Sequence, residues 1–270
     1  MSKKIQTILV VVMFAAAVLF LGAQNGPLHR SAERVPERGI SLPWGALGMK
    51  LVAAGVIDTD KLERLSGGLS KEQRALLEEP VQDVRMTEEN APYLLNLLWA
   101  LGLANRNPIL ETEMRDPRYG GADGFASTGG WTIASGHAME HYNRHPLLRL
   151  SGTQQALVEK VSRNIYRPCC DNSTHFPDCN HGMAMLALLE LMASQGTDER
   201  GLYEAALVAN SYWFPDQYRT LAAYFASRGV AWDDLDPKEL LGKKYSSASG
   251  YARIAALVRP VRSGDPSCGV

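Results

Sequence analysis

Apolar residues recur along most of the chain at the three- and four-residue spacing of amphipathic helices. The clearest run, residues 91–103, is apolar on nearly every face and predicts a helix buried in the core. We find no convincing alternation of apolar and polar residues of the kind that marks a half-buried strand. The pattern therefore predicts an all-α fold, a compact multi-helix domain. The expected helices cover residues 49–54, 69–77, 91–103, 154–166, 184–193, 199–212, 218–227 and 248–258.

Two internal similarities suggest a duplicated helical plan. Ser70, followed three residues later by Gln73, has the spacing of a capping box at a helix start, and residues 150–157 resemble residues 69–76. Residues 172–178 and 210–216 agree at five of seven positions, at an offset of 38 residues. Both copies contain a Pro-Asp pair, which is favourable at a helix start. We interpret this as a possible duplicated helix-turn-helix unit.

The N-terminus differs from the rest of the chain. Lys3 and Lys4 precede residues 5–23, which are apolar apart from Gln6 and Thr7 and carry no charge. This run approaches the ~20 residues that cross a bilayer and is longer than the ~7–15 apolar residues of a signal peptide. We therefore predict an uncleaved signal anchor in residues 1–26, with a cleaved signal peptide as the alternative. Both would place the rest of the chain outside the cytoplasm, in a periplasm or at a cell surface.

The remaining chain divides into three parts by composition. Residues 27–46 hold three prolines and scattered charges without apolar periodicity, so we predict a linker. Residues 47–262 carry the helical pattern and form the predicted extracytoplasmic domain. Residues 263–270 are a polar tail that includes Cys268. The net charge of −1 gives no reason to expect a nucleic-acid partner.

The densest chemistry lies in one short segment. Three of the four cysteines and two of the six histidines fall in residues 169–181. Thiolates and imidazoles bind zinc and copper directly, and a helix start at the Pro-Asp pair would favour the thiolate of the following cysteine. The candidate ligands are Cys169, Cys170, Cys179, His181 and His175.

The same residues allow other interpretations. The spacing matches no standard zinc-finger or haem pattern. A disulfide from Cys169 or Cys170 to Cys179 would staple the loop, and a redox-active or free thiol is a third possibility. If a metal is bound, copper and zinc are the leading candidates, with an iron–sulfur cluster behind them. Nearby methionines in residues 183–192 fit packing better than ligation.

A second histidine group lies upstream. His137, His141 and His145 recur every four residues, which would align them on one side of a helix. We name His137 and His141 as additional metal ligands or proton carriers, with a plain polar helix face as the alternative. The glycine-rich residues 119–131 suit a long surface loop or a lid over these histidines.

These observations support one leading function and two alternatives. The leading hypothesis is an exported, membrane-tethered protein that binds a soft metal for storage, delivery or redox chemistry. It would contact the membrane through residues 5–23 and exchange metal with a partner protein or membrane complex. The alternatives are a metalloenzyme with an open metal position and a disulfide-stapled helical interaction scaffold. The sequence contains no nucleophile elbow or other recognisable catalytic triad.

Overall fold

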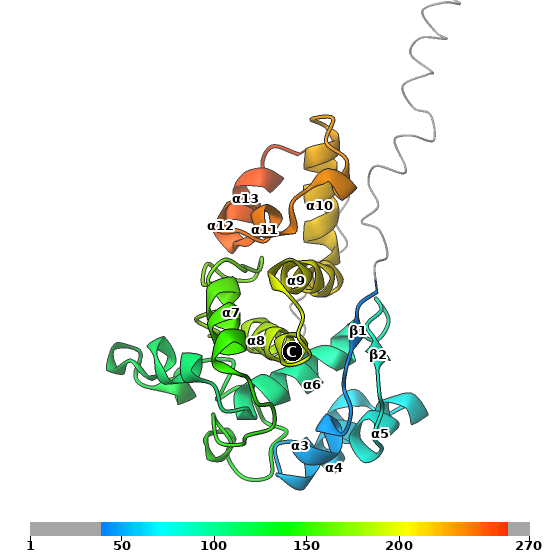
Figure 1. The fold of residues 1–270 in the computed structure, drawn as a ribbon, viewed down its shortest axis with the longest axis vertical. Helices are drawn as coiled ribbons and strands as arrows, with labels where there is room; N and C mark the ends of the chain where they lie inside the picture. The colour runs from blue at the N-terminus through cyan, green and yellow to red at the C-terminus, as the bar shows by residue number, and fades with distance from the viewer. Residues whose placement is uncertain (1–38, 259–270) are drawn as a thin grey trace, which may run out of the picture.

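The computed structural model describes residues 39–258, which form a mostly helical fold (Figure 1). Short 3₁₀ turns occupy much of residues 108–140. The strands are β1 (Ser41–Leu42) and β2 (Val84–Arg85). The α-helices are α3 (Leu47–Ala53), α4 (Thr59–Ser66), α5 (Lys71–Glu78), α6 (Ala91–Ala104), α7 (Gly152–Ser162), α8 (Asn180–Ser194), α9 (Glu199–Trp213), α10 (Pro215–Ala226), α11 (Pro237–Leu240), α12 (Lys243–Ser246) and α13 (Ala248–Ala255).

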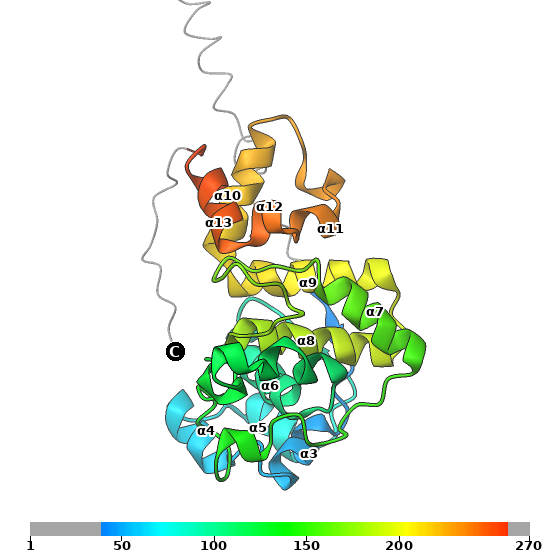
Figure 2. The ribbon, with the colours of Figure 1, turned by 90° about the vertical axis from the view of Figure 1, so that its left-hand side faces the viewer.

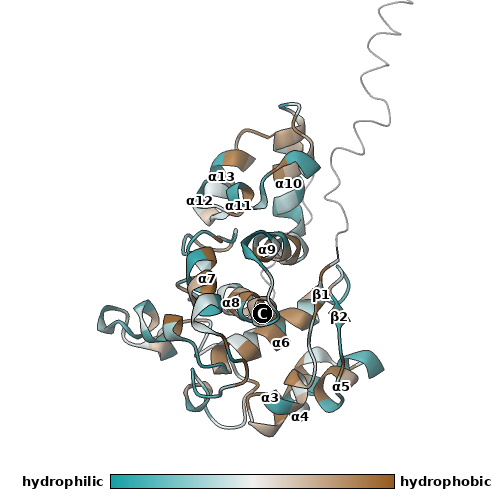
Figure 3. Ribbon diagram, viewed as in Figure 1, coloured by the Kyte–Doolittle hydropathy of each residue, from teal (hydrophilic) through white to brown (hydrophobic). Residues whose placement is uncertain are grey.

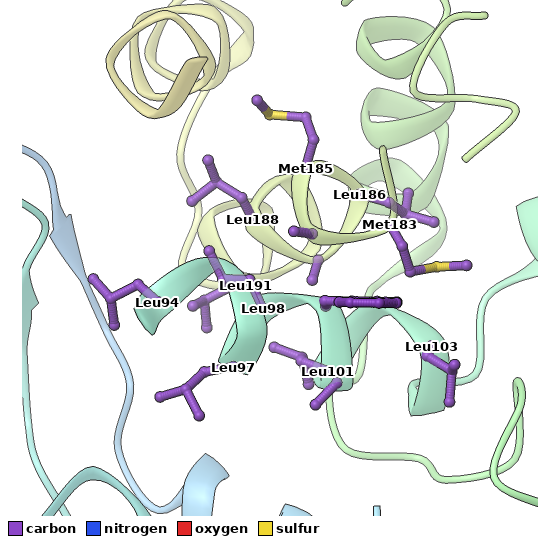
Figure 4. Packing of buried hydrophobic residues seen from close by; sticks show 14 of the residues in the cluster. Leu94, Leu97, Leu98, Leu101, Leu103, Met183, Met185, Leu186, Leu188 and Leu191 are labelled. Carbon is purple, nitrogen blue, oxygen red and sulfur yellow. The ribbon is translucent and has the colours of Figure 1, made fainter. Parts of the chain in front are cut away.

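Helices α6 and α8 pack against each other at the centre of the core (Figure 4). Both are apolar around most of their circumference, which is the composition of a helix covered on all sides. In Figure 3, hydrophobic residues are prominent on these inner helices, whereas the peripheral turns carry more hydrophilic residues. The predicted buried helix at residues 91–103 is therefore confirmed.

A close backbone approach joins the two helices. A Cβ added to Gly102 of α6 would overlap the carbonyl oxygen of Met183 in α8. We expect Gly102→Ala to lower the free energy of unfolding by about 2 kcal/mol, because the new methyl group must push the helices apart. Urea denaturation measures this difference.

Gly152, the first residue of α7, provides the matched control. A Cβ added there meets nothing within 4 Å, so Gly152→Ala should change the free energy of unfolding by less than about 0.5 kcal/mol. Equal effects of the two substitutions would show that the contact between α6 and α8 tolerates a side chain.

The first strand corrects the extent of the predicted linker. β1 pairs antiparallel with β2, and the adjacent Trp44 is buried with its indole N–H donating to the Leu76 carbonyl oxygen. The C-terminal end of the segment we assigned to a linker thus belongs to the folded domain. Each strand has only two residues, too few to produce a visible alternation in the sequence.

The last helices surround a second, smaller core. Helix α9 separates them from the central bundle (Figure 2). Asn210 of α9 connects the two parts, because its amide donates to the Tyr166 carbonyl oxygen and to the Tyr218 hydroxyl. The buried apolar residues of this second core are Phe214, Tyr218, Leu221, Leu240, Tyr245 and Ile254.

One of the two internal similarities corresponds to a shared structure. Ser70 caps α5 with Gln73 completing the capping box, and Ser151 caps α7 with Gln154 in the same way. The other similarity does not. Residues 172–178 form an irregular loop, whereas residues 210–213 end α9 and α10 begins at Pro215. The two Pro-Asp segments are therefore not copies of one structural unit.

Two predictions fall outside the described residues. The signal anchor or signal peptide in residues 1–26 and the tail 263–270 with Cys268 both lie there. Within residues 39–258, no helix combines the length and the apolar character needed to cross a membrane.

Candidate metal centre

Three cysteine sulfurs converge in the loop between α7 and α8. The Sγ atom of Cys179 lies 3.7 Å from that of Cys169 and 4.0 Å from that of Cys170. All three Sγ atoms lie within 4.8 Å of one another, and all three cysteines are free thiols. Cys169 is exposed, so the cluster is accessible at the surface of the protein.

Cys179 is the N-cap residue of α8. Its sulfur accepts a hydrogen bond from the backbone N–H of Gly182 in the first turn. Hydrogen bonds from Cys169 and Cys170, together with the positive charge of Arg167, hold the pKa of Cys179 well below its usual range. The predicted position of Cys179 at a helix start is therefore confirmed, although α8 begins two residues after the Pro-Asp pair, and this position favours the thiolate.

Arg167 is the residue that the sequence did not single out. Its side chain is fully buried, and its guanidinium donates to three acceptors. They are Cys179 Sγ at 3.1 Å, the Asn172 carbonyl oxygen at 3.0 Å and Asp178 Oδ1 at 3.0 Å. Burial disfavours its charge, but the negative charges of the cysteines outweigh burial and raise its pKa. The buried guanidinium of Arg167 thus places a positive charge next to the Cys179 sulfur.

A glycine makes room for this guanidinium. A Cβ at Gly182 would overlap Arg167 Nη2, so a side chain at this position is incompatible with the observed placement of the arginine. Asp178, which also binds Arg167, accepts a second hydrogen bond from the Asn172 amide. The loop is therefore organised around the guanidinium rather than around a hydrophobic side chain.

The other two cysteines have the opposite protonation preference. Hydrogen bonding to Cys170 and Cys179 raises the pKa of Cys169. For Cys170 the hydrogen bond with Cys169 lowers the pKa, but the bond with Cys179 and burial raise it to about 11. These opposite shifts favour the thiolate at Cys179 and the thiol at Cys169 and Cys170.

No protein-family model matches the chain, and no curated protein and no solved structure is significantly similar to it. The chemistry of the cluster must therefore be inferred from its own residues.

The two histidines of the cysteine segment do not join the three sulfurs. His181, in the first turn of α8, stacks against Phe214 with ring centroids 4.5 Å apart, and burial lowers its pKa to about 4. His175 is buried on the other side of the loop, where its backbone N–H bonds to the Ser162 carbonyl oxygen. Among the described residues, the group that could hold a metal ion contains the three cysteines and neither of these rings.

The upstream histidines do not form a helical stripe, which corrects our prediction. His137 is exposed at the start of a single 3₁₀ turn, with Nε2 3.7 Å from Asp123. His141 stacks on His145, and their ring nitrogens lie 3.2 Å apart. The chain cannot continue as a helix here because Asn143 adopts a positive φ of 55°. Neither His137 nor His141 belongs to the group of three cysteines.

The glycine-rich loop packs against the cysteine segment as well as near His137. Its Phe125 ring lies 5.3 Å from Phe176, and the Ser127 N–H donates to the Asp178 carbonyl oxygen. Ser127 is itself buried and accepts from the Trp99 indole. The glycine-rich loop therefore packs against the cysteine segment at Phe176 and Asp178.

The spacing of the sulfurs suits two chemical outcomes. An ion held at about 2.3 Å by thiolates requires sulfurs about 3.8 Å apart in tetrahedral geometry, close to the two separations from Cys179. The same proximity would allow Cys179 to form a disulfide with Cys169 after a small movement. The cluster can thus hold one soft ion or become oxidised.

Proposed function

We propose that this chain binds a single soft metal ion, copper(I) or zinc, through Cys169, Cys170 and Cys179. The observation that carries the proposal is the convergence of three free thiols within 4.8 Å of one another beside the buried charge of Arg167. Three thiolates with a divalent ion form a complex with a net negative charge. The complex with copper(I), a monovalent ion, has one more negative charge. A buried guanidinium compensates that charge where water cannot.

The donor set favours thiophilic ions over hard ones. Thiolates select copper(I) and zinc, whereas calcium and magnesium prefer oxygen ligands. Three thiolates complete a trigonal copper(I) site. Zinc would retain a fourth position for a water molecule or a ligand from a partner, which is the arrangement that the metalloenzyme alternative requires. An iron–sulfur cluster normally takes four cysteines, one more than the group provides.

Storage or delivery of the ion is the role we propose. Transfer between proteins proceeds by exchange of one thiolate at a time and needs a sulfur that an incoming ligand can reach. Cys169 is exposed and meets this requirement. Export and tethering through residues 5–23 remain part of the proposal and rest on the two lysines and the uncharged apolar run that follows them.

Elemental analysis of the full chain, purified without added metal, tests the site. We expect about one equivalent of copper or zinc per chain, its loss in Cys179→Ser, and its retention in His137→Asn, which alters an exposed histidine beside Asp123. Adding the ion to metal-free protein at neutral pH should release about two protons, one each from Cys169 and Cys170.

A free-thiol count on the same sample identifies the competing outcome. Absence of metal together with two missing thiols would mean that two of the four cysteines form a disulfide, and the metal proposal would be wrong. Metal retained in Cys179→Ser would place the ion elsewhere in the chain and contradict it as well.

A further inference from the structure

A second candidate site lies away from the cysteines. A cavity of about 800 Å³ opens between the chain that follows α6, the segment that leads into α7, and the first turns of α7. Its volume falls in the range of pockets that take small organic molecules. No residue of the cysteine loop lines it, so the two sites are independent.

The cavity is positively charged although the chain as a whole is not. Three arginines and one glutamate line it. Arg115 pairs with that glutamate, Glu111, at 3.0 Å. Among residues 39–258, no carboxylate forms an ion pair with Arg106 or Arg144. Two guanidiniums are therefore available for an anion that enters the cavity.

The start of α7 adds to this preference. Ser151 and Gly152, the N-cap and first residue of this 11-residue helix, are part of the cavity wall. Backbone N–H groups and the positive end of the helix dipole favour negative charge at such a position. Gly152 leaves this end of the helix open, since nothing lies within 4 Å of the place where a Cβ would be.

Part of the cavity lining is apolar. Met139, Leu148 and Leu150 are each only partly buried and face the cavity beside the ring of Tyr142. Such residues would cover the hydrocarbon part of a ligand whose charged group reaches the arginines. The lining thus offers both charged and apolar surface to a ligand.

The floor is rigid because its polar groups are already hydrogen-bonded. Asn107 is buried, and its amide donates to Gln155 and to the fully buried carboxyl group of Glu190. Its backbone N–H donates to Asn143 Oδ1 at 2.7 Å. Asn143, held at a positive φ of 55°, is thereby fixed in the wall. A floor that does not reorganise lowers the cost of ordering a ligand.

We propose that this cavity binds a small organic anion, a carboxylate or phosphate carried by an apolar body, with the anionic group on Arg106 and Arg144 and the apolar body against Leu148 and Leu150.

The test uses phenyl phosphate and benzoate as probes, added to the isotope-labelled full chain in NMR titrations, with benzylamine as the cationic probe of similar size. We expect saturable shifts of the Asn143 and Gly152 amides with at least one anion and none with benzylamine. Tighter binding of phenyl phosphate would indicate that the natural ligand is a phosphate ester, and tighter binding of benzoate would indicate a carboxylate.

Paired variants supply the control. Arg106→Gln combined with Arg144→Gln should weaken the preferred anion by about tenfold or more, because two charge-assisted hydrogen bonds are lost. Arg149→Gln changes an exposed arginine that lies between two lining residues but does not line the cavity, so it should leave the affinity unchanged. All three positions are exposed, which keeps the substitutions compatible with folding.

Three results would overturn the proposal. They are the absence of saturable binding of both anions, equal binding of benzylamine, and an equal loss of affinity in Arg149→Gln and in the double variant.

Discussion

Arg167→Met should lower the free energy of unfolding by about 3–5 kcal/mol, the usual cost of removing one partner from a buried ion pair. The substitution leaves Asp178 and the Cys179 thiolate without the charge that offsets them. It also leaves the Asn172 carbonyl oxygen without its donor. Methionine has a similar length and fills part of the space, so the loss comes chiefly from electrostatics and hydrogen bonding.

Chemical denaturation of the metal-free protein measures this effect. The matched control is Arg200→Met on α9, where the arginine pairs with Glu204 but is 86% exposed. That surface pair should contribute no more than about 0.5 kcal/mol. Arg167→Lys separates charge from geometry, since an ammonium group keeps the charge but cannot reach the three acceptors as a planar fork. We expect it to be less stable than the native protein and more stable than Arg167→Met.

The same substitution should change the chemistry of the cluster. Without the guanidinium, the pKa of Cys179 should rise, because one of the causes that lowers it is gone. Titration of thiolate ultraviolet absorbance, compared with Cys179→Ser to assign the signal, follows this shift. An unchanged titration with an unchanged stability would mean that Arg167 is only space-filling, and the electrostatic account of the site would fail.

The sequence predicted the helices with an apolar face better than the short polar ones. Helices α6 and α8 were visible because nearly every face is apolar, and the start of α5 was visible because a capping box needs only a serine and a glutamine at fixed spacing. Helix α7 begins at Gly152, two residues before its expected start at residue 154. Helix α4 was missed. Half of its residues are charged and only Leu62 is buried, so it leaves almost no apolar pattern.

The candidate site was predictable only where its residues are close in sequence. Cys169, Cys170 and Cys179 belong to one loop, and their meeting required no long-range contact. Arg167 lies in the same loop, but a charged side chain is normally exposed, and nothing in the local pattern indicates that this one is buried.

The histidine prediction failed for a different reason. A four-residue spacing aligns side chains only if the backbone is helical. Here the segment makes a single 3₁₀ turn and then reverses at Asn143. The arginine cavity could not be predicted for a related reason, since Arg106 and Arg144 line it from segments that are distant along the chain.

Glu190 presents the remaining electrostatic problem of the core. It lies on α8 and is fully buried. Asn105 donates to its Oε2 at 3.0 Å, and Asn107 donates to its Oε1. No positive side chain pairs with it among the described residues. Burial therefore prevails over the two hydrogen bonds and raises its pKa to about 8. Near neutral pH the folded protein holds a proton here that the unfolded chain releases.

The free energy of unfolding of the native protein should therefore fall as pH rises, and we expect this fall to be absent in Glu190→Gln. A carboxyl group whose pKa is higher in the folded state stabilises the protein fully below its unfolded pKa and loses this contribution as pH rises through the folded value. With an unfolded value of 4.5 and a folded value of about 8, the native protein should lose about 3 kcal/mol from this group between about pH 5 and 8.

The measurement is the free energy of unfolding across this pH range for the native protein, Glu190→Gln and Glu204→Gln, which alters an exposed carboxylate on α9. Burial lowers the pKa of His175 and of His181, and these groups act with the opposite sign, destabilising the folded state as pH falls. They are common to all three proteins, so the difference between native and variant curves isolates Glu190. A difference curve for Glu190→Gln as flat as that for Glu204→Gln would mean that Glu190 ionises normally, and that its two asparagine partners suffice to stabilise a charge in the core.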